Sequence, residues 1–316
     1  MATPNRDQTF RVFTAEQAAA YATGRAGSYP EPVYQAIMDF HQGKRELCLD
    51  VGTGPGKAVW DLLNYFDRCI GCDAGEQMIE QAKKDAVRLG VSDRACFVNV
   101  PAESCADALT RSNLPPASAD VITAATAAHW FDMPAFYTSA AKALRPGGTL
   151  AMWTVSSFNF HPSVPNYETI QRIVHKLEDE TLAPYMQPSS ILTRGAYEQL
   201  PLPWSAGDAS TSPFDQSSFK RCDWDRDGIP SAPPLADGTP GPFLLGRGMT
   251  LERASAALGS TSAVIRWRQA HPDKAGTDED PVVACVKLLR EVMGGSDGEL
   301  NASPSLSLLL MRKRQE

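Results

Sequence analysis

The sequence lacks any long run of apolar residues. Its first ten residues, MATPNRDQTF, contain no apolar stretch of the kind that a secretory signal carries. No segment approaches the roughly 18 consecutive apolar residues that a membrane-spanning helix needs. We therefore expect a protein of the cytoplasm that has no membrane partner.

Basic charge is also scarce. Lys and Arg together number 30 against 37 Asp and Glu, which gives a net charge of −7 and a pI near 5.3. Proteins that bind nucleic acid cluster Lys and Arg to neutralise phosphates. The acidic balance of this chain disfavours nucleic acid as its main partner.

The seven cysteines are scattered and odd in number. Cys69 and Cys72 fit the spacing CxxC, but both fall within one predicted strand, where residues three apart point to opposite faces. We interpret them as buried thiols, and we expect no metal site and no redox pair. Reduced thiols are typical of the cytosol.

Helical and strand patterns alternate through the first half of the chain. Apolar residues at helical spacing predict helices at 15–23, 31–42, 58–66, 76–89 and 133–144, and short apolar runs predict strands at 46–51, 69–73, 95–100, 119–125 and 149–155. Pro146-Gly147-Gly148 is predicted to be a turn. The alternation predicts an α/β fold with a mostly parallel, doubly wound sheet.

The pattern changes after about residue 157. Residues 158–248 are rich in Pro, Ser, Gly and aromatics, with one predicted helix at 167–180 and a Pro/Gly-rich loop at 231–243. Helices are predicted again at 251–258, 262–269 and 281–293, before a last strand at 305–314.

Three glycines at alternate positions, Gly52, Gly54 and Gly56, follow the first predicted strand. This GxGxG spacing differs from the GxGxxG of dinucleotide-binding folds, which disfavours a nicotinamide cofactor. Acidic residues end the first two strands, Asp50 and Asp73, and a carboxylate at Asp73 can accept both hydroxyls of a ribose. We favour a nucleoside site over a tight turn with a surface acid.

Five segments in order resemble the motifs of the class I S-adenosylmethionine-dependent methyltransferases: DVGTGPG, GCDAGEQM, PAES, ADVITAATAAHWFD and LRPGGTLAMW. The segments YATGRAGSYP, AAHWFD and LAPYMQPSSILTRGAYEQLPLPW are similar to the trans-aconitate methyltransferase group. The resemblance implies a Rossmann-like methyltransferase fold with a seven-stranded sheet and a lid insertion. It also implies S-adenosyl-L-methionine as cofactor.

The same resemblance divides the chain into four parts. Residues 1–43 would form an N-terminal helical cap, and residues 44–157 the cofactor-binding methyltransferase core. Residues 158–260 would form an acceptor lid and insertion. Residues 261–316 would supply C-terminal helices and the last strand, completing the core.

Cofactor contacts are also implied by the resemblance. They fall on Tyr21, Arg25, Asp50, Gly52, Thr53, Gly54, Asp73, Ala74, Met78, Ala102, Glu103, Ala127 and His129. In this scheme Asp73 accepts from the ribose hydroxyls, and Glu103 flanks the adenine. Arg25 pairs with the cofactor carboxylate, or is a solvated charge on a helix.

His129 and Trp130 follow the fourth predicted strand, at the edge where doubly wound sheets bind ligands. His129 is a candidate catalytic base, or else a structural histidine, and an ionised carboxylate acceptor needs no base. Trp130 and Tyr197 are candidate contacts to the acceptor, although Trp130 is equally well explained as a core aromatic.

The expected function is methyl transfer to an oxygen, carboxylate or hydroxyl, of a small organic acid or secondary metabolite, by a monomer or homodimer. Two alternatives remain open from the sequence. One is a cofactor-binding fold that catalyses a different reaction, such as a cyclisation. The other is a non-catalytic partner that binds the cofactor and regulates another enzyme.

Overall fold

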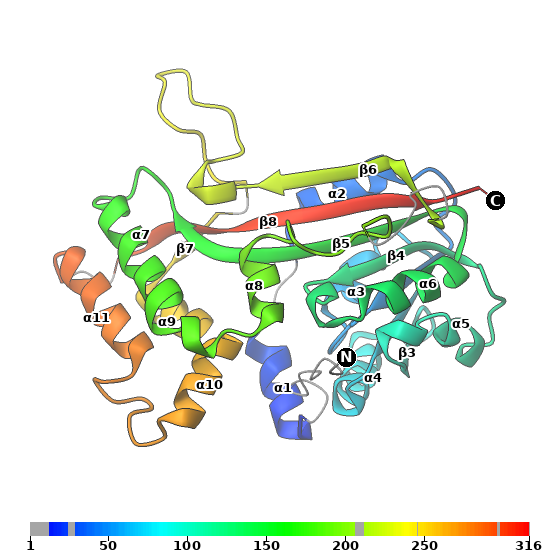
Figure 1. Ribbon diagram of the computed structural model, residues 1–316, viewed down its shortest axis with the longest axis horizontal. Coiled ribbons are helices and arrows are strands. Elements are labelled where there is room, and N and C mark those ends of the chain that lie inside the picture. Colours follow the sequence, from blue (N-terminus) through cyan, green and yellow to red (C-terminus); the bar gives the residue numbers. More distant parts are fainter. Residues whose placement is uncertain (1–12, 25–28, 206–211, 245, 296–297, 316) are drawn as a thin grey trace. The chain divides into compact units, whose positions relative to one another are not determined.

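The structure is a computed structural model that describes residues 13–24, 29–205, 212–244, 246–295 and 298–315. Its strands form one sheet in the order β3-β2-β1-β4-β5-β8-β6, and β7 pairs with β8 outside that path (Figure 1). The strands are β1 (Leu47–Val51), β2 (Arg68–Asp73), β3 (Ala95–Asn99), β4 (Ala119–Ala125), β5 (Leu144–Phe160), β6 (Phe214–Trp224), β7 (Arg247–Met249) and β8 (Leu300–Lys313). The predicted path of seven strands is confirmed.

Helices alternate with the first strands and then follow one another in the later part of the chain. The first group is α1 (Ala15–Gly24), α2 (Glu31–Phe40), α3 (Lys57–Leu62), α4 (Glu76–Leu89), η1 (Ala102–Ser104), α5 (Asp107–Arg111), η2 (Ala128–Trp130) and α6 (Met133–Ala143). The second group is α7 (Tyr167–Lys176), η3 (Leu177–Thr181), η4 (Ala183–Tyr185), α8 (Pro188–Arg194), η6 (Arg226–Gly228), α9 (Leu251–Gly259), α10 (Ser262–Ala270) and α11 (Pro281–Val292).

The chain divides into two compact units. The first contains residues 1–154, 199–222 and 308–316. In it β1, β2, β3, β4 and β5 pair in parallel, with β2 on one side of β1 and β4 on the other. The strand order therefore reverses at β1, which is where ligands bind at the carboxyl edge of such sheets.

The Pro-Gly-Gly segment is part of β5, and the prediction of a separate turn there is wrong. Leu144 pairs with Ala119 while Thr149 pairs with Val121, so residues 145–148 lie opposite a single residue of β4. The strand absorbs the extra residues as a β-bulge, which keeps pairing on both sides of the irregularity.

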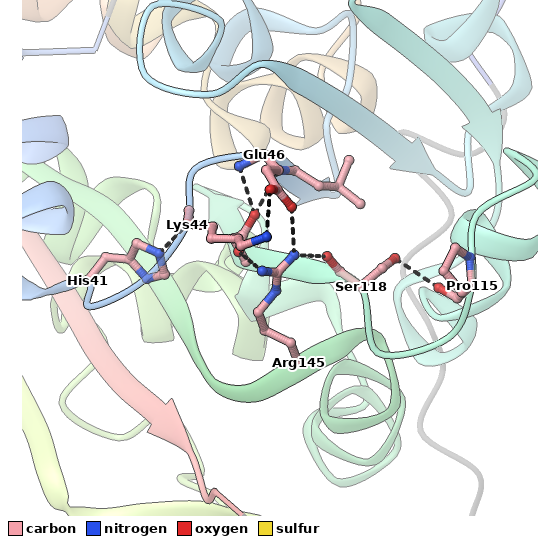
Figure 2. A network of polar contacts seen from close by, with 8 residues as sticks. His41, Lys44, Glu46, Pro115, Ser118 and Arg145 are labelled. Atoms are coloured by element: carbon pink, nitrogen blue, oxygen red, sulfur yellow. Dashed lines mark hydrogen bonds and ion pairs between the residues drawn. The ribbon is translucent and has the colours of Figure 1, made fainter.

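A polar network joins the amino ends of β1, β4 and β5 (Figure 2). Asp120, fully buried on β4, accepts hydrogen bonds from the backbone N–H groups of Glu46 and Leu47 at 2.8 and 2.9 Å. Arg145, in the bulge, forms an ion pair with Asp120 at 2.8 Å and donates to the carbonyl of Ser118 at 3.0 Å. The network fixes three neighbouring strands at the edge opposite the glycine loop.

The second unit contains residues 155–198 and 223–307, and its core is built mainly from α7, α9, α10 and α11. Buried Asp225 anchors a long loop: its Oδ1 accepts from the backbone N–H groups of Ser231 and Leu244, and its Oδ2 accepts from the hydroxyl of Ser303. Residues 231–243 contain no helix or strand, as predicted (yellow loop in Figure 1).

Apart from the short 3₁₀ helices η1, η2, η4 and η6, four elements were not predicted from the sequence: α5, α8, β6 and β7. The sequence of β6, FDQSSFKRCDW, is polar at most positions and has no apolar run. The helix predicted at 167–180 ends earlier, because α7 gives way to a π-helical turn at Leu177–Thr181. Within the described ranges, no helix combines the length and apolar character needed to cross a membrane.

Candidate functional site

The loop that joins β1 to α3 is held against β2 by its backbone. The N–H groups of Gly52 and Thr53 both donate to the carbonyl of Cys72, at 2.8 and 3.0 Å. Gly52 has φ +68°, and a Cβ built on it would lie 2.6 Å from the Cβ of Ala127. Glycine is required there because the backbone adopts the left-handed region and passes directly against the segment that follows β4.

Gly54 differs from Gly52 in its surroundings. It also has positive φ, +52°, but a Cβ built on it would meet no atom of the described residues within 4 Å. Its N–H donates to Oδ2 of Asp73 at 2.8 Å. The loop therefore presents an open face of backbone next to a carboxylate, which suits the close approach of a ligand.

Asp73, the last residue of β2, connects two loops. Its Oδ2 accepts from Gly54, and its Oδ1 accepts from the N–H of Gly75 at 2.7 Å, just before α4. The side-chain amide of Asn99, at the end of β3, donates to the Asp73 carbonyl at 2.9 Å. These bonds fix both the position and the plane of the carboxylate at the carboxyl edge of the sheet.

Asp50 lies beneath the glycine loop and is only 1% exposed. Its Oδ1 accepts from the hydroxyl of Thr123 at 2.6 Å, whereas its Oδ2 and the hydroxyl oxygen of Thr53 have no hydrogen-bond partner among the described residues. Burial raises the pKa of Asp50 to about 6; the charge of Asp73 adds to the rise, and the hydroxyls of Thr123 and Thr53 oppose it. Thr53 acts on this pKa by proximity, without full hydrogen-bond geometry.

The residues expected beside the adenine (Ala102, Glu103) and beside Asp73 at the ribose (Ala74, Met78) come from three segments of the same unit. Ala102 is buried in η1, which packs against α6, and Met78 is buried in α4. Ala74 is half-buried in the turn after β2. Oε1 of Glu103 accepts from the backbone N–H of Asp132 at 3.0 Å, which ties the segment after β3 to the segment after β4.

The end of β4 leads directly into the predicted catalytic segment. Ala127 is buried against Gly52, so the structure brings this predicted contact to the glycine loop. His129 and Trp130 lie in the short helix η2 with their ring centroids 4.9 Å apart, and both are half-buried. Their position after β4 puts them at the sheet edge that Asp73 and the glycine loop occupy.

Three predicted contacts, Tyr21, Arg25 and Tyr197, stay predictions. Arg25 lies outside the described residues. Tyr21 is half-buried on α1, with its ring centroid 6.1 Å from that of Phe13, and α1 packs against α4. Tyr197 is buried in the second unit with a left-handed backbone, φ +62°, and its contact with an acceptor stays a prediction.

The thiols of the predicted CxxC pair are free and buried in β2, as expected. Burial raises the pKa of Cys72 well above its ordinary value. In the part of the chain that the structure describes, no group of His, Cys, Asp and Glu is arranged to hold a metal ion.

The sequence analysis missed a second cluster at the same edge. The hydroxyls of Tyr29 and Thr126 lie 3.0 Å apart, and the ring centroids of Tyr29 and Trp153 lie 5.3 Å apart in an edge-to-face contact. A signal was available, because Tyr29 is the second tyrosine of YATGRAGSYP and Trp153 ends LRPGGTLAMW. Thr126 directly follows β4 with a left-handed backbone, φ +49°.

The segment that contains this site is similar to a known protein family. Residues 49–152 match the family model described as "Methyltransferase domain". With its strand order and its glycine loop, the core has the fold of the class I S-adenosylmethionine-dependent methyltransferases.

The chain is similar to curated relatives over part of its length and to a solved structure over most of it. The chain is 30% identical over 149 residues to "Probable S-adenosylmethionine-dependent methyltransferase CRG1" of Saccharomyces cerevisiae, with 47% of this chain and 48% of that protein covered. It is 30% identical over 188 residues to "Methyltransferase cfoB" of Aspergillus candidus, with 58% and 56% covered. The chain thus spans about half the length of these relatives. A structure from Anaeromyxobacter dehalogenans described as a "Putative Type II Methyltransferase" has a TM-score of 0.62 at 23% identity, with 92% and 98% covered, and supports the fold.

S-adenosyl-L-methionine is the methyl donor that the matched family implies, and the residues present fit it. The open face of Gly54 beside Asp73 leaves room for a ribose against the loop. The buried oxygens of Asp50 and Thr53 that have no hydrogen-bond partner lie beneath the same loop. Acceptor oxygens and negative charge suit the hydroxyls, the amino group and the sulfonium of this molecule.

Proposed function

We propose that the protein transfers a methyl group from S-adenosyl-L-methionine to an oxygen atom of a small organic acid or related metabolite. The observation that carries the proposal is the carboxylate of Asp73, which is held by the N–H groups of Gly54 and Gly75 beside an open stretch of backbone. This arrangement lies within the segment that matches the methyltransferase domain model.

Asp73 is placed to accept from the ribose hydroxyls, because its carboxylate plane is fixed at the end of β2 next to the loop. Thr53 and the backbone of Gly52 and Gly54 form the loop surface against the methionyl and ribose part. Ala102 and Glu103 flank the adenine, and Ala74 and Met78 pack near Asp73 at the ribose. These roles follow the resemblance of the motifs and agree with the strand that each residue ends or follows.

Asp50 contributes negative charge at the base of the loop. With a pKa of about 6, most of its carboxyl is ionised at neutral pH despite burial. A cation bound above the loop, such as the amino group of the methionyl part, stabilises that ionised form. We therefore expect binding of the cofactor to favour loss of the Asp50 proton.

When bound, the cofactor supplies an electrophilic methyl group on a sulfonium. The protein's task is then to hold an acceptor oxygen in line with that methyl and to exclude water. A carboxylate acceptor is ionised at neutral pH and needs no base, whereas a hydroxyl acceptor needs one. His129 is placed at the right edge of the sheet to serve as that base or to contact the cofactor.

An organic acid is the favoured acceptor because the N-terminal segment, the AAHWFD segment and the segment 182–204 are similar to the trans-aconitate methyltransferase group. The relatives from Saccharomyces cerevisiae and Aspergillus candidus both bear names of methyltransferases, which supports the reaction type.

Isothermal titration calorimetry with S-adenosylhomocysteine and NADH tests the cofactor. Incubation with methyl-labelled S-adenosylmethionine and a panel of small carboxylic acids and phenols then tests the reaction. We expect S-adenosylhomocysteine to bind and label to reach an oxygen. Binding of NADH in place of S-adenosylhomocysteine would contradict the proposal, and tight cofactor binding with no acceptor labelled would favour a different reaction or a regulatory role.

A further inference from the structure

A polar cluster lies on the β4–β5 side of the glycine loop. Asp73 ends β2, on the other side of β1, and the segment assigned to adenine follows β3, farther in the same direction. Trp153, in the middle of β5, pairs with Ala125, the last residue of β4. The cluster formed by Tyr29, Thr126 and Trp153 therefore lies beyond the methionyl end of the proposed cofactor site.

The side chains of this cluster are held from several directions. The hydroxyls of Tyr29 and Thr126 form a hydrogen bond of 3.0 Å. The backbone N–H of Tyr29 donates to Oδ2 of Asp61, on α3, at 3.2 Å. The hydroxyl of Tyr34, on α2, donates to the same Asp61 oxygen at 2.8 Å. Tyr29 is thus held by contacts to Thr126 and Asp61, and Asp61 is itself fixed by Tyr34.

Trp153 supplies an unused donor. Its side chain is fully buried, and its Nε1–H has no hydrogen-bond partner among the described residues. The indole contacts Tyr29 and Tyr34 only through edge-to-face ring packing, with centroids 5.3 and 6.1 Å away. A buried N–H without an acceptor costs roughly 1–3 kcal/mol, so its retention points to an acceptor that arrives with a ligand.

Positive charge lies beside the same cluster. Nζ of Lys57, the first residue of α3, is 4.4 Å from the centroid of the Tyr29 ring. A cation on the ring face, together with hydroxyl and indole N–H donors, makes this corner favourable for an oxygen anion. The rings of Trp153 and Tyr34 provide flat apolar walls next to those donors.

We propose that Tyr29, Thr126 and Trp153 bind the methyl acceptor, and that the acceptor is a planar molecule with an anionic oxygen, a carboxylate or a phenolate. Trp153 donates its indole N–H to that oxygen, and Tyr29 and Thr126 orient it. Lys57 provides the nearby positive charge. This assignment rests on the proposed function, because it identifies the acceptor side of the same site.

The experiment follows the indole N–H signals of the full chain labelled with ¹⁵N-tryptophan, saturated with S-adenosylhomocysteine. The six tryptophans give six signals, and Trp153→Phe assigns the one of interest. Where that variant does not fold, the signal is assigned by elimination from the Trp→Phe variants at 60, 130, 204, 224 and 267. The added probes are benzoate, 4-nitrophenolate and the neutral isostere benzamide.

We expect benzoate or 4-nitrophenolate to move the Trp153 signal downfield, and benzamide to bind at least about tenfold more weakly, because a hydrogen bond to a charged group is the stronger kind. Tyr29→Phe keeps the ring over which Lys57 lies. This variant is expected to bind the anion with roughly tenfold lower affinity. Tyr65→Phe is the matched control, since its hydroxyl bonds to exposed Glu31 outside the cluster, and it leaves the affinity unchanged.

Three outcomes would overturn the assignment: the anions leave the Trp153 signal unmoved, benzamide binds as well as benzoate, or Tyr29→Phe has no effect. If S-adenosylhomocysteine did not bind in the calorimeter, the result would instead contradict the proposed function, and this assignment would be wrong as well. The two failures are distinguishable, because the cofactor is measured before any probe is added.

Discussion

The carboxylate of Asp73 accepts a hydrogen bond from the backbone N–H of Gly54 at 2.8 Å, which links the end of β2 to the loop that follows β1. The same carboxylate accepts from Gly75, so one side chain fixes two loops. The proposed ribose partner is thereby also the residue that shapes the glycine loop. Substitutions at this position are expected to affect binding both directly and through the loop.

Replacement of Asp73 by Ala is expected to weaken binding of S-adenosylhomocysteine by roughly a hundredfold or more. The estimate assumes loss of two hydrogen bonds to a charged group, each contributing about 1.5–3 kcal/mol. Calorimetry measures the effect. Glu80→Ala on α4 is the control, because that side chain is exposed and pairs only with Lys83 at the surface, and its affinity should stay within about twofold of the parent. Equal affinities in the two variants would remove Asp73 from the cofactor site.

The two glycines of the loop make a matched pair. Gly52→Ala places a Cβ 2.6 Å from Ala127 at positive φ, so we expect a stability loss of roughly 2–5 kcal/mol from overlap and backbone strain. Gly54→Ala has the strain alone, about 1–2 kcal/mol, because no atom of the residues that the structure describes lies within 4 Å of its Cβ.

Affinity for S-adenosylhomocysteine should show the opposite order, with the larger loss in Gly54→Ala. The Cβ of Gly54→Ala enters the open space that we assign to the cofactor, so a folded variant is expected to lose at least about tenfold in affinity for S-adenosylhomocysteine. Urea denaturation and calorimetry on both variants measure the two effects separately. If Gly54→Ala binds as the parent does, that open space is not part of the cofactor site.

Asp50 gives a pH-dependent prediction. Burial raises its folded-state pKa from 3.8 to about 6, so the native protein holds this proton more tightly than the unfolded chain does. The stabilisation is complete below about pH 4 and is lost as the pH rises through 6. From this group alone, the free energy of unfolding should fall by roughly 2 kcal/mol between pH 4 and 7.

Asp50→Asn keeps an oxygen that can accept from Thr123 but cannot ionise. The difference in unfolding free energy between this variant and the parent should therefore grow in favour of the variant as the pH rises from 4 to 7. Urea titrations at several pH values give the curve. A constant difference across that range would show that Asp50 is not titrating with a raised pKa.

Much of the first unit could be predicted because its elements carry strong periodicity. The limits predicted for the helix 76–89 and the strand 119–125 agree with α4 and β4 at both ends. The glycine loop, Asp73 and Ala127 could be named in advance because they lie in short motifs whose positions relative to the strands are fixed. No such motif marks β6, whose polar sequence gives no apolar pattern.

Other features depend on contacts between distant parts of the chain. The bulge at 145–148 looks like a turn in the sequence, and only its pairing with β4 shows that the strand continues. The cluster of Tyr29, Thr126 and Trp153 joins residues more than 90 positions apart, so their proximity follows from the sheet order. The unused indole N–H of Trp153 can be identified only when all neighbouring acceptors are placed.

The network at the amino ends of the strands gives a last prediction: its disruption should lower stability and leave cofactor affinity unchanged. Asp120 is fully buried, accepts from the N–H groups of Glu46 and Leu47, and pairs with Arg145 (Figure 2). Asp120→Ala leaves those donors and the cation without their partner, so we expect a loss of roughly 3–5 kcal/mol in unfolding free energy. Asp120→Asn keeps an oxygen for the two N–H groups and should lose less.

Neither variant should change the affinity for S-adenosylhomocysteine. β4 is seven residues long, so about 20 Å separates this network from the carboxyl edge that holds the glycine loop. Urea denaturation and calorimetry on the same preparations, at a temperature where both variants remain folded, make the comparison. If a folded Asp120→Asn protein lost affinity, the prediction that this network affects stability alone would be wrong. The amino ends of the strands would then influence the position of Asp73 and the glycine loop at the other edge of the sheet.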